Sequence, residues 1–306
     1  MTDLRSISEL LRRERRARIF FAVLAQSALG TGAGYVALLL VAYDRFRSPW
    51  AITLVLLADL VPAMALGPLF GAAADRWSRR GCVVAADALR GGAFLGIALV
   101  GSFEATIALA LLAGVGTGLF TPAALAGLPS LVERRRLSAA TALYGAITDA
   151  GFTAGPAIAA AVLWIGGTDA ILIGNAVTFA LSAAVLLRVP FGRRPARPPD
   201  EQPLKVRFPL LREARAGVRA TAGMPGVRLL LLATAAALFI GGVFNVGELL
   251  LAREELDAGA AGFSLLVAGS VVAIATQSAS MTRGSNCVPE PARSSLMACC
   301  CDSAPR

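Results

Sequence analysis

Histidine is absent from the 306-residue chain, charged residues make up only 16% of it and aromatic residues only 7%. Without histidine the chain cannot build a Ser-His-Asp triad, a His-ligated metal site or an imidazole proton shuttle. The low charge, against about a quarter in ordinary soluble domains, and the hydrophobic share of 56% argue against a water-soluble fold. Walker-type, HExxH and GxSxG motifs are also missing. We therefore expect no enzyme, no cofactor and no metal site.

Cysteine is also sparse and unevenly placed. Cys82 precedes residue 281, and the others follow it at Cys287, Cys299, Cys300 and Cys301. Three adjacent cysteines do not have the spacing of a zinc site, and palmitoylation remains a second interpretation. The segment 281–306 differs in composition from everything before it, so we interpret it as a disordered, non-native tail.

Long apolar segments are what the chain has in abundance. A helix needs about 20 apolar residues to cross the hydrocarbon core, and the alternating pattern of a membrane barrel is absent. Inside lipid the backbone must satisfy its own hydrogen bonds, which favours helices. The sequence therefore predicts an all-α, polytopic transmembrane fold with eight helices near residues 19–42, 50–74, 82–101, 105–127, 140–165, 169–189, 227–251 and 261–280.

The basic residues alternate from one side of the proposed membrane to the other. The first, third, fifth and seventh connections carry only Arg45, Arg47 and Arg253, whereas the N-terminus and the even-numbered connections are rich in arginine. Because cytoplasmic loops carry the excess of Lys and Arg, we expect a multi-pass protein of the plasma (inner) membrane with a cytoplasmic N-terminus. The net charge of +9 then serves topology and contact with anionic lipid head groups rather than nucleic-acid binding.

The spacing of the runs divides the chain into five parts. These are a basic cytoplasmic N-terminus (1–18), a six-helix bundle (19–189), a proline-rich cytoplasmic linker (190–226), two helices of a second bundle (227–280) and the tail (281–306). Within the linker, residues 208–222 are compatible with an amphipathic surface helix or with a merely solvated segment.

The loop between the second and third runs holds the most specific motif, GPLFGAAADRWSRRGCVV. Its pattern G-x-x-x-D-R-x-x-R-R resembles the signature loop of the major facilitator superfamily in sequence and in position. The resemblance implies a gating loop in which Gly71 permits close helix packing and the charged residues form breakable ion pairs. The alternative is a positive-inside loop without a gating role. The residues concerned are Gly71, Asp75, Arg76, Arg79 and Arg80.

Further segments resemble the drug-efflux branches of that superfamily, the macrolide-efflux type above all. They include FTPAALAGLPSLV, GNAVTFALSA and the helix-five sequence GFTAGPAIAA. The last is similar to the antiporter motif and keeps Gly151, Gly155 and Pro156, of which the proline bends a helix. The helix-four arginine of the superfamily is missing, with Leu112 in its place, which weakens any mechanism that depends on that arginine.

Ionisable residues inside apolar runs are functional candidates because each is expensive to insert. Asp87 and Arg90 share a helix face, and Arg90 and Asp149 fall at similar depth, so we expect a structural Asp87–Arg90–Asp149 cluster. Asp59 lies near mid-membrane without an evident partner and is the better candidate for proton coupling. Glu248 is expected at the membrane interface.

Two glycine clusters and several polar residues complete the candidates. Small residues four apart pack helices, and neither cluster matches a nucleotide-binding pattern, so we expect close helix packing at Gly30, Gly32, Gly34, Gly114, Gly116 and Gly118. Candidate residues of a substrate cavity are Gln26, Tyr35, Asn175 and Asn245.

These features favour a secondary transporter that exports small amphipathic compounds in exchange for protons. Its partners would be a small-molecule substrate, protons and the lipid bilayer. Members of the superfamily have twelve or fourteen helices, and eight are expected here, so a truncated, non-transporting membrane fragment remains an alternative. A transporter of other small metabolites is a third interpretation, and the sequence leaves the substrate and the direction of transport open.

Overall fold

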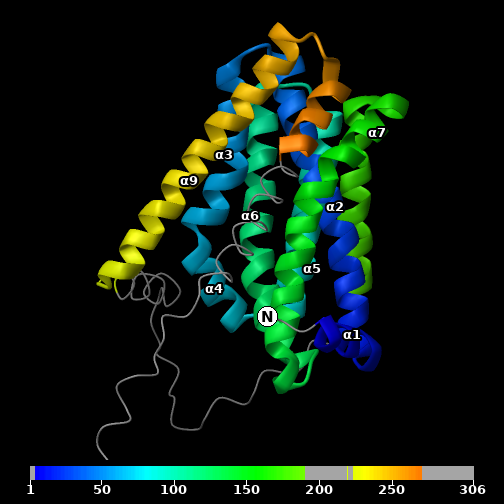
Figure 1. The fold of residues 1–306 in the computed structure, drawn as a ribbon, viewed down its shortest axis with the longest axis vertical. Coiled ribbons are helices and arrows are strands. Elements are labelled where there is room, and N and C mark those ends of the chain that lie inside the picture. The colour runs from blue at the N-terminus through cyan, green and yellow to red at the C-terminus, as the bar shows by residue number, and fades with distance from the viewer. Residues whose placement is uncertain (1–3, 190–218, 220–222, 271–306) are drawn as a thin grey trace, which may run out of the picture. The chain divides into compact units, whose positions relative to one another are not determined.

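The computed structural model describes residues 4–189, 219 and 223–270. All regular elements in these residues are helical, which confirms the expected all-α fold (Figure 1). The described residues up to Ala268 form one compact unit. Apart from residue 219, the proposed surface helix over 208–222 lies outside the described residues, and so does the tail over 281–306.

The chain begins with a helix that the sequence did not lead us to expect. Helix α1 (Leu4–Arg13) precedes α2 (Arg15–Phe46), the helix of the first apolar run. Leu10 of α1 is fully buried in a core cluster that also contains Phe20 and Leu128. The apolar side of this short basic helix is therefore part of the bundle core.

The second apolar run forms two helices instead of one. Helix α3 (Pro49–Ala65) ends at Leu66, and α4 (Gly67–Arg76) starts directly after it. Pro62 lies inside α3 and a second proline opens α4, and each removes a backbone donor from the helical ladder. The break at Leu66 follows from these two prolines.

The next four runs lie in three helical elements, the last of which holds two of the runs. Helix α5 (Arg79–Leu99) and helix α6 (Phe103–Gly127) are followed by two 3₁₀ turns, η1 (Leu128–Ser130) and η2 (Arg134–Arg136). Helix α7 (Leu137–Leu186) contains both the fifth and the sixth run, which meet at Gly167, where φ is +72°. Glycine takes this left-handed conformation without strain, and the chain reverses there.

The last described helices belong to the proposed second bundle. Helix α9 (Pro225–Leu250) continues into a π-helical turn, η3 (Leu251–Glu255), and another helix runs over residues 259–270. Five helical segments of the described chain are long and apolar enough to cross a membrane. This number is smaller than the eight expected runs for three reasons. Helix α7 contains two runs, and the second run is divided between α3 and α4, which are each too short. The last run is described only to Ser270.

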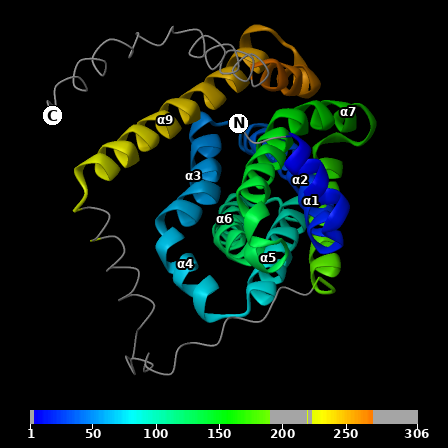
Figure 2. The ribbon, with the colours of Figure 1, turned by 60° about the horizontal axis from the view of Figure 1, so that its bottom comes forward.

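Glycine clusters bring the helices into backbone contact, as the sequence predicts. A Cβ atom on Gly32 of α2 would lie 2.3 Å from the carbonyl oxygen of Gly151 in α7. Helix α6 lies between α3 and α5 (Figure 2). A Cβ on Gly114 would meet Asp59 of α3 at 2.1 Å, and one on Gly116 would meet Arg90 of α5 at 2.7 Å. These positions accept no side chain without movement of the helices.

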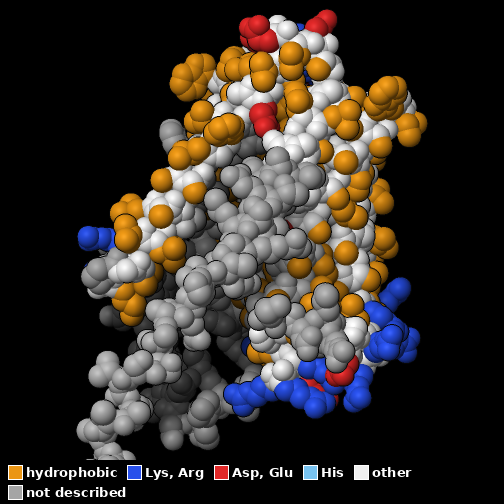
Figure 3. Space-filling model, viewed as in Figure 1, with side chains coloured by type: hydrophobic (Ala, Val, Ile, Leu, Met, Phe, Trp, Pro, Cys, Tyr) orange, Lys and Arg blue, Asp and Glu red, His pale blue; other side chains and the backbone are white. Residues whose placement is uncertain are grey.

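The surface of the bundle has an apolar middle and two different ends (Figure 3). We call the end formed by α1, the start of α2, η1 and η2 the basic end, because its exposed arginines include Arg12, Arg13, Arg15, Arg16, Arg18, Arg134 and Arg135. The opposite end, where α2 meets α3 and η3 follows α9, is the far end. Trp50 and Trp164 are 76% and 80% exposed there, and Trp77 is 60% exposed near the basic end. Tryptophan at both limits of an apolar band is typical of membrane interfaces.

Ion pairs hold the basic end together. Arg136 is buried and lies 3.4 Å from Glu14, so it ties η2 to the start of α2. Arg135 donates a hydrogen bond of 2.5 Å to Glu133, which lowers the pKa of that exposed carboxyl together with the charges of nearby arginines. The first pair thus connects the N-terminal segment to the six-helix bundle.

Candidate functional site

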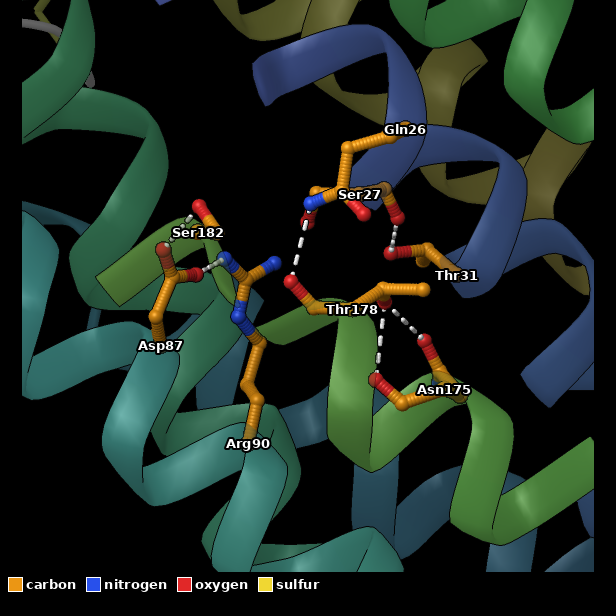
Figure 4. A network of polar contacts seen from close by, with 8 residues as sticks. All are labelled: Gln26, Ser27, Thr31, Asp87, Arg90, Asn175, Thr178 and Ser182. Carbon is orange, nitrogen blue, oxygen red and sulfur yellow. Dashed lines mark hydrogen bonds and ion pairs between the residues drawn. The ribbon is translucent and has the colours of Figure 1, made fainter. Parts of the chain in front are cut away.

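A buried ion pair occupies the middle of the first bundle (Figure 4). Asp87 and Arg90 stand one helical turn apart on α5, and the guanidinium donates to the carboxylate. Ser182 of α7 donates a second hydrogen bond to Asp87, of 2.5 Å. Both charged side chains are at least nine-tenths buried. The expected pairing of Asp87 with Arg90 is therefore present, and its third member is Ser182.

Asp149 does not join this cluster, contrary to the expectation from depth alone. Its side chain is exposed on α7, and the described partners of Asp87 are Arg90 and Ser182. Depth along a helix is set by residue number, but direction around the axis is set by packing. The face of α7 that packs on α2 carries Gly151 and Gly155, and Asp149 points elsewhere.

Two aromatic rings enclose the guanidinium of Arg90. Its central carbon lies 4.3 Å from the ring centroid of Phe120 in α6 and 4.3 Å from that of Phe179 in α7. Such contacts stabilise a cation where water is excluded. The Nε atom of Arg90 has no hydrogen-bond partner among the described residues. The positive charge is thus held by one carboxylate and two ring faces.

A second polar group joins α2 to the last part of α7 (Figure 4). Gln26 donates to the carbonyl oxygen of Thr178 at 2.8 Å, and the Thr178 hydroxyl lies 3.3 Å from Oδ1 of Asn175. Asn175 is only 1% exposed and packs where Gly30 and Gly34 leave space. Asn175 is thus buried at the interface of α2 and α7, and its place in a substrate cavity stays a prediction.

Asp59 lies half-buried on α3, next to the glycine stretch of α6. The positive charge of Arg90 is close enough to interact with the carboxylate of Asp59. The carboxylates of Asp59 and of Glu248 in α9 both interact electrostatically with Tyr35 of α2. Tyr35 is half-buried and makes an edge-to-face contact with Phe152, with ring centroids 6.4 Å apart. Carboxylates of α3 and α9 therefore lie within electrostatic reach of one tyrosine of α2. The side chain of the remaining cavity candidate, Asn245, lies outside what the structure describes.

An apolar groove of about 510 Å³ runs between α3 and α6. Its lining side chains are all apolar and include Pro62, Leu66 and Leu112. Leu112 is the residue that stands in place of the missing helix-four arginine, so this position carries no charge here.

The helix-five motif forms a close contact between α7 and α2. A Cβ atom on Gly155 would lie 2.5 Å from the backbone of Gly32, and one on Gly151 would lie 2.6 Å from Ala28. Helix α7 continues through Pro156, and the residue inside it with non-helical torsions is Gly167. The motif therefore serves close packing of α7 on α2.

The loop between α4 and α5 differs in part from expectation. A Cβ atom on Gly71 would meet nothing within 4 Å, so the prediction that this glycine permits close helix contact is wrong in the described structure: α4 packs on α6 through Phe70 instead. Ser78 caps α5 by accepting the backbone N–H of Gly81 at 3.2 Å. Arg79 is half-buried and Arg80 exposed; the side chain of Asp75 lies outside the described set. The gating role of the loop, including Arg76, stays a prediction.

The far end contains two ion pairs that the sequence analysis missed. Arg45 lies 2.9 Å from Asp169, and Arg253 donates to Asp44 at 2.8 and 2.9 Å. The signal available in the sequence was the isolation of these charges in connections that otherwise have few. Their pairing depends on helix ends that are far apart in the chain.

A comparison with family profiles decides the class of protein. The profile described as Major Facilitator Superfamily matches residues 19–285. The chain belongs to the major facilitator superfamily. A search of curated proteins finds no match to it.

Membership fixes the general function of these helices. Members of the superfamily are membrane-embedded transporters rather than enzymes. The described part of the chain contains no group of three or more acidic or cysteine side chains placed to hold a metal ion. Charged side chains inside the bundle of such a transporter are candidates either for proton coupling or for stabilising the helix packing. Here these side chains are Asp59, Asp87 and Arg90.

Proposed function

We propose that the protein is a proton-coupled efflux transporter of the drug- or macrolide-exporting type. It exports small amphipathic compounds through the plasma membrane by alternating access of a site between two bundles. The N-terminus and the basic end face the cytoplasm, which the arginine distribution supports. The apolar groove between α3 and α6 supports a substrate with a large apolar part.

The observation that carries the proposal is the position of Asp59. This carboxylate is half-buried inside an apolar helix and belongs to no ion pair among the described residues. Asp87, by contrast, is paired with Arg90 and accepts a hydrogen bond from Ser182. The ionisable groups around Asp59 are Arg90 on α5, Tyr35 on α2 and Glu248 on α9. A carboxylate that is not committed to a structural pair is suited to gain and lose a proton during the cycle.

Replacement of Asp59 by asparagine tests this assignment. In proteoliposomes with an imposed pH gradient, we expect the wild-type protein to drive accumulation of a fluorescent amphipathic dye. Asp59→Asn abolishes gradient-driven accumulation but retains exchange of dye for dye, because asparagine cannot carry a proton and the bundles still rock.

The matched control is Glu104→Gln, which removes an exposed carboxylate in the first turn of α6 and leaves both activities unchanged. Gradient-driven accumulation by Asp59→Asn at the wild-type rate refutes Asp59 as the proton site. Wild-type protein that inserts into the bilayer but moves dye in neither assay refutes transport by this chain and favours the alternative of a non-transporting membrane fragment.

A further inference from the structure

A two-point contact at the far end joins the first bundle to the first helix of the second. The Nη2 atom of Arg253, in η3, donates to Oδ1 of Asp44 at 2.8 Å and to Oδ2 at 2.9 Å. The guanidinium also lies 5.6 Å from the ring centroid of Tyr43. Tyr43 and Asp44 lie in the last turn of α2, and Asp44 is 209 positions from Arg253 in the sequence. This contact therefore couples elements that only the fold brings together.

The other cation of the far end is bound differently. Arg45 donates to the carbonyl oxygens of Ile97 and Val100 at 2.8 and 2.6 Å, and to Asp169 at 2.9 Å. Ile97 lies on α5, Val100 directly follows that helix and Asp169 lies on α7, so all three partners belong to the first bundle. Arg45 therefore holds helix ends together inside one bundle, whereas the ion pair of Arg253 with Asp44 connects the first bundle to α9.

Helix α9 is attached to the rest of the chain mainly near this contact. Most of its side chains are exposed along the membrane-spanning part, as for Leu229, Leu232 and Phe244. Burial begins at Leu249 and Ala252, which are fully buried immediately before Arg253. The π-helical turn η3 gives this segment its own geometry, and such turns are frequent at functional sites.

The ion pair between Arg253 and Asp44 has the properties of a contact that can break and re-form. The side chains of Arg253 and Asp44 are 19% and 37% exposed, so water reaches both. Partly exposed ion pairs contribute little stability because water and salt compete for the charges. By contrast, Asp87 and Arg90 are sealed inside the bundle and do not exchange partners with solvent.

We propose that Tyr43, Asp44 and Arg253 form a far-end clasp that gates the outer side of the transport pathway. With the clasp closed, the outer ends of α2 and α9 stay together; when Arg253 leaves Asp44, these ends separate and the space between the bundles opens outward. The assignment rests on the proposed transport function and names gating residues beyond the loop between α4 and α5.

Labelling of a single reporter cysteine tests the clasp without any need for transport. All native cysteines are replaced by serine, and Tyr35→Cys is introduced on α2, where the charge of Glu248 in α9 is felt. In intact cells, a membrane-impermeant maleimide is added outside. Asp44→Asn and Arg253→Gln are each expected to raise the labelling rate severalfold, and the exchanged pair Asp44→Arg with Arg253→Asp returns it to the parent rate.

Asp169→Asn is the control, since it removes the exposed partner of Arg45 inside one bundle and leaves the rate unchanged. Parent rates in both neutral variants overturn the proposal. So does an exchanged pair that labels as fast as the neutral variants, because loss of packing and not of charge then explains the effect.

A cross-link provides a second measurement should the neutral variants misfold. Asp44→Cys with Arg253→Cys, joined by a short reducible thiol cross-linker, is expected to stop dye exchange in proteoliposomes, and reduction restores it. Exchange that continues through the cross-link overturns the clasp. Since labelling requires no transport, a wild-type protein that fails to move dye refutes the proposed function while the labelling rates still judge the clasp.

Discussion

Replacing Asp87 by alanine is expected to destabilise the protein by about 3–5 kcal/mol, the usual effect of leaving one partner of a buried ion pair behind. Arg90 would keep its two ring contacts but lose its carboxylate. Ser182 would lose its acceptor at the same time. Unfolding by a denaturing detergent, followed by circular dichroism in micelles, measures the change.

Two further variants distinguish the charge from the packing. Asp87→Ala combined with Arg90→Leu removes both charges and is expected to recover most of the lost stability, because an apolar replacement of both partners is often nearly neutral. Asp149→Ala removes an exposed carboxylate of α7 and is expected to change the stability by less than about 0.5 kcal/mol. If the double variant is no more stable than Asp87→Ala, the unpaired charge of Arg90 is not the cause of the lost stability.

The sequence predicts the helical membrane fold because its main determinants are local. Apolar length and the side on which arginines gather are both properties of contiguous segments. The division of the second run follows from prolines that are visible in the sequence, Pro62 and Pro68, although we did not predict it. Helix α1 was missed because ten residues rich in arginine bury only one side, and that burial depends on the rest of the bundle.

The candidate site was predictable only where its members share one helix. Asp87 and Arg90 stand three residues apart on α5, so their contact follows from helix geometry. Ser182 and Asp149 both lie on α7, yet only Ser182 faces the pair. Which way a residue faces depends on how α7 packs against α2 and α5, and no single-sequence periodicity in a helix that is apolar all round defines that direction.

The far-end contacts show the same limit over a longer range. Asp44 and Arg253 are isolated charges at two helix ends, and the sequence gives no preference for this pair over others. Their contact requires that η3 be placed beside the end of α2, which depends on the packing of two bundles. Opposite charges in short outer connections are therefore candidates for pairing, but the fold selects the partners.

Replacing Gly155 by alanine is the second substitution with a large expected effect, and a matched control on the same helix is not expected to destabilise the protein. The added Cβ would lie 2.5 Å from the backbone of Gly32, and backbone atoms cannot change rotamer to make room. Helices α2 and α7 must therefore move apart, with an expected loss of about 1–3 kcal/mol for an overpacked interface. Detergent-induced unfolding measures this loss.

The same substitution at Gly145, on the same helix, isolates the cause. A Cβ there would meet nothing within 4 Å, and alanine favours a helix over glycine by about 1 kcal/mol, so Gly145→Ala is expected to be neutral or stabilising. Equal destabilisation by the two variants contradicts the close approach of α2 and α7. If only Gly155→Ala loses stability, glycine is required in the antiporter-like motif because the backbones of α2 and α7 touch there. Any movement of α7 during transport must then carry α2 with it.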